Sequence, residues 1–212
     1  KMKRVINLDN WNRKEHFKFF SALDDPFWGI TTTVDFTSIY QQSKNMEVSF
    51  FLYSVYFLLK CINATTAFKL RIENGEVVEY DKINISPTIG REDGTFGFGF
   101  FEYDTDLSLF IENAEKEIHR VKNSTGLSFS KDTARADVIR YSALPWFAFS
   151  EMKHAGSIQT GDSIPKISTG KLIQEKKKLL LPISISVHHG LVDGRNVAEF
   201  IQNLKDGQNN TL

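Results

Sequence analysis

Several features that would assign this chain to a specialised class of protein are scarce or missing. Only one of its 212 residues is cysteine and only five are proline. No intrachain disulfide can form, and no proline- or serine-rich linker divides the chain. We therefore expect one domain over residues 1–212, with a tail that is frayed from about residue 206. The lone thiol, Cys61, lies in an apolar run, which is typical of a structural cysteine in a reducing compartment.

Charge and hydropathy exclude further classes. The 26 Lys and Arg residues balance the 26 Asp and Glu residues, so the chain has no net charge that would attract nucleic acid or an anionic membrane. The longest apolar window, residues 50–59, is well short of the roughly 20 residues that a bilayer requires. The basic residues 1–4 precede no apolar signal-peptide core, so we expect a cytoplasmic protein.

What the sequence does contain is apolar surface and a regular succession of strands and helices. Hydrophobic residues make up 41% of the chain and 18 residues are phenylalanine, which is typical of a globular domain. Alternating and 3.6-residue periods of apolar residues predict an α/β two-layer sandwich, in which helices cover a mixed β-sheet. The expected strands cover residues 5–8, 28–36, 68–72, 76–80, 95–103, 138–141, 166–173 and 179–189, and the expected helices cover residues 11–20, 37–43, 48–63, 104–122 and a segment after residue 194.

Two local patterns add detail to this prediction. Asn74 and Gly75 separate two of the expected strands and supply the positive φ angles that a tight hairpin turn requires. In residues 95–103, three phenylalanines occupy one face of a strand, whereas Gly97 and Gly99 leave the other face bare. Such a bare face indicates close approach of another group, which is either packed protein or a ligand.

The most informative segment is residues 188–194, which read HHGLVDG. Apolar residues alternate with Ser184 and Ser186 upstream, so the histidines lie at the end of a strand, and a helix follows. By alternation His189 falls on the apolar face, where the imidazolium is disfavoured and an unprotonated nitrogen is kept at pH 7. This pattern favours His189 as a general base, with Asp193 bracing the turn. The alternative is a histidine pair that only satisfies local hydrogen bonds.

Two further segments accompany this motif: residues 11–17 read WNRKEHF and residues 142–146 read SALPW. Together the three resemble the patterns HHxxxDG, WxRKEHF and SAxPW of the chloramphenicol acetyltransferase family, in the same order and over nearly the whole chain. HHxxxDG alone also resembles motifs of dihydrolipoamide acyltransferase cores and peptide-synthetase condensation domains. Because a condensation domain is about twice as long and an acyltransferase core normally travels with lipoyl segments, both are secondary alternatives.

The resemblance implies a chloramphenicol acetyltransferase-like, CoA-dependent acyltransferase fold. It also implies that acetyl-CoA, as a co-substrate and without a metal, gives its acetyl group to a hydroxyl of chloramphenicol or a similar hydrophobic xenobiotic. The resemblance implies that His189 is the general base that takes the proton of the acceptor hydroxyl as this hydroxyl attacks the thioester directly, and that the Ser142 hydroxyl stabilises the oxyanion. Taken alone, Ser142 is typical of a strand-end hydrogen bond.

Two charged residues would hold the catalytic turn. Asp193 resembles the family aspartate that pairs with an arginine, and Arg13 matches that arginine. Taken alone, Asp193 is typical of a helix N-cap and Arg13 of a solvated helix residue. The resemblance also implies a homotrimer whose sheet continues between subunits, with His189 of one chain facing the pocket of its neighbour.

Other residues match the family's binding surfaces. Trp146 would border the pantetheine channel, Lys171 would meet a coenzyme phosphate, and Ser168, or Thr169 after a one-residue slip, would help to hold solvent. The residues that match the acceptor pocket are Phe19, Phe20, Phe96 and Phe98. Core packing is the competing explanation for the aromatic residues, and a solvated surface is the competing explanation for Lys171.

The chain departs from the family mainly around the acceptor pocket. Phe20 stands where tyrosine is common, and residues 24–26 read DDP in place of an apolar segment. Residues 90–93 and 50–52 also differ from the family pattern. These changes place charge near the acceptor and leave three alternatives: another hydroxyl acceptor, a lipoyl- or carrier-bound thioester, or a homologue that binds drug or CoA without catalysis.

Overall fold

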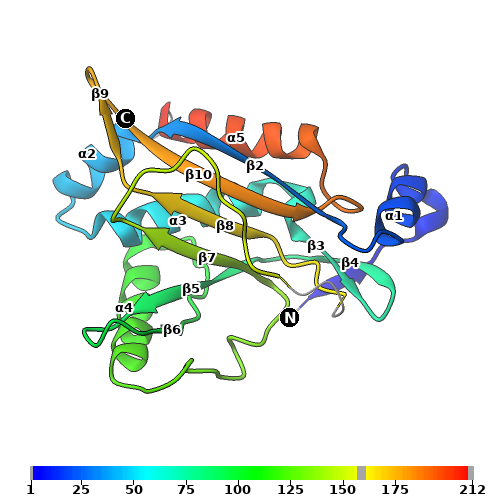
Figure 1. Ribbon diagram of the computed structural model, residues 1–212, viewed down its shortest axis with the longest axis horizontal. Helices are drawn as coiled ribbons and strands as arrows, with labels where there is room; N and C mark the ends of the chain where they lie inside the picture. Colours follow the sequence, from blue (N-terminus) through cyan, green and yellow to red (C-terminus); the bar gives the residue numbers. More distant parts are fainter. Residues whose placement is uncertain (1, 157–160, 210–212) are drawn as a thin grey trace.

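The main sheet of the protein is mixed. A computed structural model describes residues 2–156 and 161–209, and its main sheet has the strand order β2-β10-β8-β7-β5-β6, with β9 beside β10 (Figure 1). β8, β7 and β5 run parallel, and the other pairs are antiparallel. The strands are β2 (Phe27–Asp35), β5 (Asn84–Gly90), β6 (Phe96–Phe98), β7 (Val138–Leu144), β8 (Lys166–Gly170), β9 (Ile173–Glu175) and β10 (Lys178–His188).

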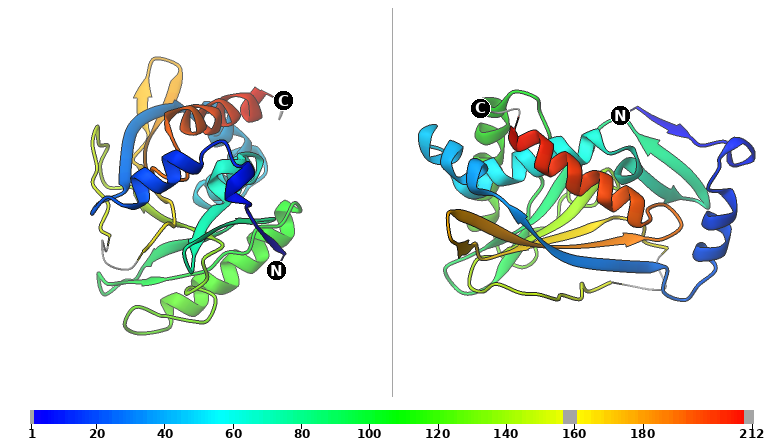
Figure 2. Two further views of the ribbon diagram at one scale, coloured as in Figure 1. Left: turned by 90° about the vertical axis from the view of Figure 1, so that its right-hand side faces the viewer. Right: turned by 90° about the horizontal axis from the view of Figure 1, so that it is seen from above.

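One face of this sheet carries the hydrophobic core. Helices α2 (Thr37–Asn45), α3 (Phe50–Ala64) and α5 (Gly194–Asn209) cover that face, as Figure 2 shows from above. The apolar positions of β10, Ile183, Ile185 and Val187, are completely buried in this core, and burial of such side chains is the main favourable term in folding. Helix α4 (Leu107–Lys122) packs beside β5 and β6. The predicted arrangement of helices on a mixed sheet is confirmed.

A second, small sheet contains the predicted hairpin. Its strands are β1 (Lys3–Val5), β3 (Leu70–Glu73) and β4 (Glu76–Tyr80). Asn74 and Gly75 have φ angles of 51° and 81°, as the turn prediction requires. The fully buried Arg71 donates to the backbone carbonyls of Phe68, Leu70, Ala136 and Val138 and so ties this sheet to the start of β7.

Strand β5 was not predicted from the sequence. Ile85 and Ile89 alternate with polar residues, but Pro87 lies between them and lacks an N–H donor, which argues against a strand in the sheet interior. The structure buries these polar groups with partners: Asn84 donates to the Asp137 carboxylate, and the Ser86 hydroxyl donates to the Gly99 carbonyl. Satisfied hydrogen bonds let a polar strand occupy the sheet interior.

The strand expected over residues 95–103 is shorter than predicted. It consists of β6, followed by a single bridge between Phe101 and Ile85. A Cβ atom at Gly97 would lie 2.6 Å from the Arg91 guanidinium and 2.9 Å from Val121 of α4. The bare glycine face is therefore filled by packed protein.

Several element boundaries also differ from the prediction. The first α-helix, α1 (Lys14–Ser21), begins three residues later than expected, after the short 3-10 turn η1 (Leu8–Asn10). A second such turn, η2 (Thr66–Lys69), precedes β3, and the strand expected over residues 166–173 is divided into β8 and β9. Helix α5 extends to Asn209, and the buried Gln208 side chain donates to the Leu204 carbonyl. No helix in the described ranges is long and apolar enough to cross a bilayer.

Candidate active site

The two adjacent histidines at the end of β10 have different surroundings. His188 is 4% exposed, its Nδ1 accepts a hydrogen bond from the Gly190 N–H at 3.1 Å, and its ring lies against Phe27. Burial lowers the pKa of His188 to about 4. His188 is therefore neutral at pH 7 and uses its basic nitrogen inside the turn, which makes it unsuitable as the general base.

His189 lies one residue beyond the strand and is only half-buried. Its backbone N–H donates to the Pro26 carbonyl at 2.8 Å. Its ring stacks on Phe20 with a centroid distance of 3.8 Å and an interplanar angle of 3°, and Trp28 lies 5.4 Å away on a tilted plane. Its Nδ1 atom is buried and has no hydrogen-bond partner in the described part of the chain. Two aromatic rings from α1 and β2 thus fix the plane of this imidazole.

Asp193 makes two sets of contacts, one with each carboxylate oxygen. Its Oδ1 accepts from the N–H groups of Arg195 and Asn196 at 3.0 and 3.2 Å, which caps α5. Its Oδ2 lies 2.5 Å from Arg13 Nη1, and Arg13 Nη2 also donates to the His189 carbonyl at 3.2 Å. Burial alone would raise the pKa of Asp193, but its hydrogen bonds with Asn196 and Arg13 outweigh burial and hold that pKa below its usual value. Asp193 is therefore ionised near neutral pH, and the ion pair fixes the backbone of His189.

Ser142 lies in a separate cavity of about 550 Å³. Thr88 Oγ1 donates to Ser142 Oγ at 3.1 Å, and the completely buried Ser168 lines the same cavity. Phe98 and Phe129 form one wall, with their rings stacked at a centroid distance of 5.5 Å. This cavity combines hydroxyl donors with flat apolar walls, which suits a ligand that is aromatic and polar.

The candidate residues therefore fall into two groups within one chain. His189, Asp193, Arg13 and Phe20 form the first, which we call the base half-site. The cavity with Ser142, Ser168, Thr88, Phe98 and Phe129 forms the second, which we call the hydroxyl half-site. In the described chain, no hydrogen bond or ring contact joins His189 to Ser142, and His189 does not line the cavity of Ser142.

The other binding residues predicted from the sequence have exposed side chains. Phe19 packs edge-on against Phe20 and is 64% exposed, and Phe96 packs edge-on against Phe98. Trp146 is 74% exposed, which rules out the core-packing explanation for this residue. Lys171 has an exposed side chain, and its backbone N–H donates to the Phe147 carbonyl at 2.9 Å.

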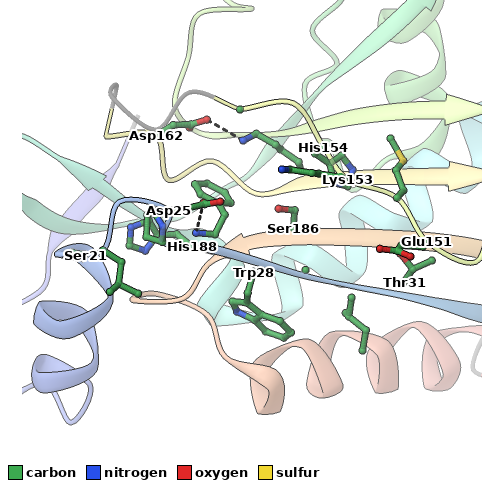
Figure 3. Close-up of a pocket in the computed structure, with 18 of the residues that line it drawn as sticks. Ser21, Asp25, Trp28, Thr31, Glu151, Lys153, His154, Asp162, Ser186 and His188 are labelled. Atoms are coloured by element: carbon green, nitrogen blue, oxygen red, sulfur yellow. Dashed lines mark hydrogen bonds and ion pairs between the residues drawn. The ribbon is translucent and has the colours of Figure 1, made fainter.

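A larger cavity of about 730 Å³ lies next to these groups (Figure 3). Ser186 and His188 reach it from β10, whereas Lys153 and His154 reach it from the segment after β7. His154, Met152 and Lys166 line both cavities and therefore stand between them. Sequence reasoning missed His154, Thr88, Phe129 and Lys166, because none belongs to a motif.

Comparisons with known proteins agree on one family. The family model for chloramphenicol acetyltransferase matches residues 2–205. Chloramphenicol acetyltransferase 3 of Escherichia coli is 28% identical over 208 residues, which cover 98% of this chain and 97% of that protein. The chloramphenicol acetyltransferase of Staphylococcus aureus is 29% identical over 214 residues, with coverage of 98% and 97%.

Solved structures give the same result. A chloramphenicol acetyltransferase structure has a TM-score of 0.89 and 30% sequence identity, and the match covers 97% of this chain and 99% of that one. A dihydrolipoamide acetyltransferase of Azotobacter vinelandii has a TM-score of 0.67 at 15% identity. The second similarity concerns the fold alone.

Proposed function

The chain belongs to the chloramphenicol acetyltransferase family, and we propose that it transfers the acetyl group of acetyl-CoA to a hydroxyl of chloramphenicol or a similar hydrophobic xenobiotic. The observation that carries this proposal is the base half-site. There, Arg13 bonds to both Asp193 and the carbonyl of His189, while Phe20 stacks on the imidazole. Such a fixed imidazole is the arrangement that general base catalysis requires.

In the proposed reaction, His189 takes the proton of the acceptor hydroxyl as its oxygen attacks the thioester carbonyl. The Ser142 hydroxyl donates to the oxyanion that forms, since Thr88 already donates to Ser142 and leaves its proton available. The carbon–sulfur bond then breaks, and the imidazolium of His189 returns the proton to the departing thiolate. Asp193 and Arg13 orient the imidazole and do not exchange protons with the substrate.

We propose that the two half-sites meet between subunits of a homotrimer. Within one chain they are separate, so a complete site needs a second copy. Aromatic side chains beside both half-sites are unusually exposed, among them Phe19 at 64% and Phe129 at 71%, as expected of surfaces that a partner covers. Strand β2 also lies at the edge of the main sheet, where a strand of a neighbour has room to pair.

Acetyl-CoA, chloramphenicol and a thiol-detecting reagent test the activity directly. Wild-type protein should release free thiol in step with formation of acetylated drug, and H189A should lower kcat by ~10²–10⁴-fold while leaving the far-UV spectrum unchanged. Tight drug binding without acetylated product would replace this proposal with a binding function. We place the reaction in the cytoplasm, as the single free thiol Cys61 predicts.

Mixed oligomers test the shared site. H189A and S142A are each expected to be nearly inactive, but co-expression at equal amounts should restore about one quarter of the wild-type sites, because each shared site draws one subunit of each kind at random. Two copies of either variant, mixed in the same way, are the control. If both half-sites act within one chain, co-expression restores nothing.

A further inference from the structure

A line of hydroxyl groups crosses the main sheet on the face opposite the helices. Ser142 of β7 pairs in register with Ser168 of β8, Ser168 pairs with Ser184 of β10, and Ser184 pairs with Thr31 of β2. Thr88 of β5 extends the line, since its hydroxyl reaches Ser142. Register partners lie on the same face of a sheet, so the line, which we call the hydroxyl row, runs through the hydroxyl half-site.

The segment after β7 covers the middle of the hydroxyl row. The Ser184 hydroxyl donates to the Met152 carbonyl at 3.4 Å, and His154 Nε2 lies 3.0 Å from Ser168 Oγ. Ser168 is completely buried, so its hydroxyl must find its partners among protein groups and cavity contents. Burial, and then the nearby Lys166 ammonium, lower the pKa of His154, which is consequently a neutral imidazole at pH 7.

The bond between His154 and Ser168 repeats the bond between Thr88 and Ser142. In each case a side chain that also lines the cavity reaches the hydroxyl oxygen of a neighbouring serine. A serine oxygen that accepts such a hydrogen bond keeps its own proton to donate to a ligand. Ser142 and Ser168 are neighbours across β7 and β8, so both protons can point into the same part of the cavity.

We propose that His154 is a positioning residue for acetyl transfer: its Nε2–H donates to Ser168 Oγ, so that the Ser168 hydroxyl becomes a second donor to the oxyanion beside Ser142. This inference rests on the proposed function, because the charge to be stabilised is the oxyanion of that reaction. A preorganised donor acts only when its proton already points at the developing charge. His154 itself contacts no reacting atom and works through Ser168.

Substitutions of His154 and Ser168 test this role by kinetics. H154L removes the polar atom, whereas H154Q keeps an amide N–H near the position of Nε2. H154L should lower kcat by ~10-fold, the effect of one modest hydrogen bond, with little change in the KM for acetyl-CoA, and H154Q should recover most of the loss. In an S168A background, H154L should cause no further loss. Equal loss in H154L and H154Q, or an H154L effect that persists in S168A, overturns the proposal.

The ring nitrogens of His154 offer a readout that does not depend on activity. Long-range nitrogen-15 spectra of the imidazoles, with His154 assigned by comparison with H154Q, should show the proton on Nε2 at pH 7. A proton on Nδ1 would mean that Ser168 donates to His154, which overturns the proposal even in an active enzyme. Wild-type protein that releases no thiol refutes the proposed function instead.

Discussion

Asp193 makes two separable contributions to stability, and two substitutions distinguish them. Asparagine caps helices about as well as aspartate, so D193N keeps the acceptor for the Arg195 and Asn196 N–H groups but removes the charge opposite Arg13. The Arg13 side chain is only 16% exposed, and it then faces an amide without its counter-charge. Loss of a charged hydrogen bond predicts destabilisation of D193N by about 2 kcal/mol. D193A also loses the cap and should be destabilised by about 3 kcal/mol.

Urea unfolding at fixed protein concentration measures both values, and the slope m should not change. For a chain of this length, melting temperatures should fall by roughly 4–8 °C for D193N and 6–12 °C for D193A. Both variants should also lower kcat, by up to ~10²-fold, because the His189 backbone loses its anchor. Equal stability of D193N and wild type would refute a stabilising Arg13–Asp193 ion pair, and equal stability of D193N and D193A would refute the helix cap.

The pH dependence of the same comparison has a definite sign. The pKa of Asp193 in the folded protein lies below its ordinary value. A carboxyl group of this kind stabilises the fold fully above the unfolded-state pKa of about 4, and its contribution is lost as the pH falls through the folded-state pKa. The gap in unfolding free energy between wild type and D193N should therefore be constant near pH 7 and shrink in acid.

Two further predictions concern the rings beside the catalytic turn. The pKa of His188 is about 4 in the folded protein. Wild-type stability should therefore fall by roughly 3 kcal/mol relative to H188N as the pH is lowered from 6.5 to 4, because H188N keeps an acceptor for the Gly190 N–H but does not titrate. Parallel curves of stability against pH for the two proteins would contradict this. Phe20 stacks on His189, so F20A should lower kcat by ~2–10-fold in steady-state kinetics, whereas F20Y should retain activity. An unchanged kcat in F20A would mean that the stacked ring does not orient the base.

The sequence predicted those parts of the molecule in which the local pattern of apolar residues matches the packing in the folded protein. The apolar alternation of β10 placed the histidines at a strand end, and the spacing of HHGLVDG placed Asp193 at a helix start. Even the pairing of Arg13 with Asp193, 180 residues apart, followed from the family resemblance. It did not follow from local physics, since an arginine in a polar helix normally faces solvent.

Long-range contacts account for what the sequence could not predict. Strand β5 is polar and contains a proline, and only its neighbours, Asp137 and the Gly99 carbonyl, reveal that such a strand is buried with its hydrogen bonds satisfied. The hydroxyl row is hidden for the same reason, because its members come from five strands and become neighbours only through register.

The arrangement of the half-sites explains why the hydroxyl groups are placed in a rigid sheet and the base in a turn. An oxyanion donor must be fixed before the charge develops, and a serine in a central strand, backed by Thr88 or His154, has little freedom to move. A general base must instead approach a substrate that binds and leaves, and His189 lies just beyond the last residue of β10, held by the Pro26 carbonyl, Arg13 and two aromatic rings. Apart from Trp28 of β2, the anchors of the base therefore lie outside the sheet. His154 lies in the segment after β7, but it holds the completely buried Ser168 of β8, so the conservative variant H154Q is needed to separate an effect on the rate from an effect on the fold.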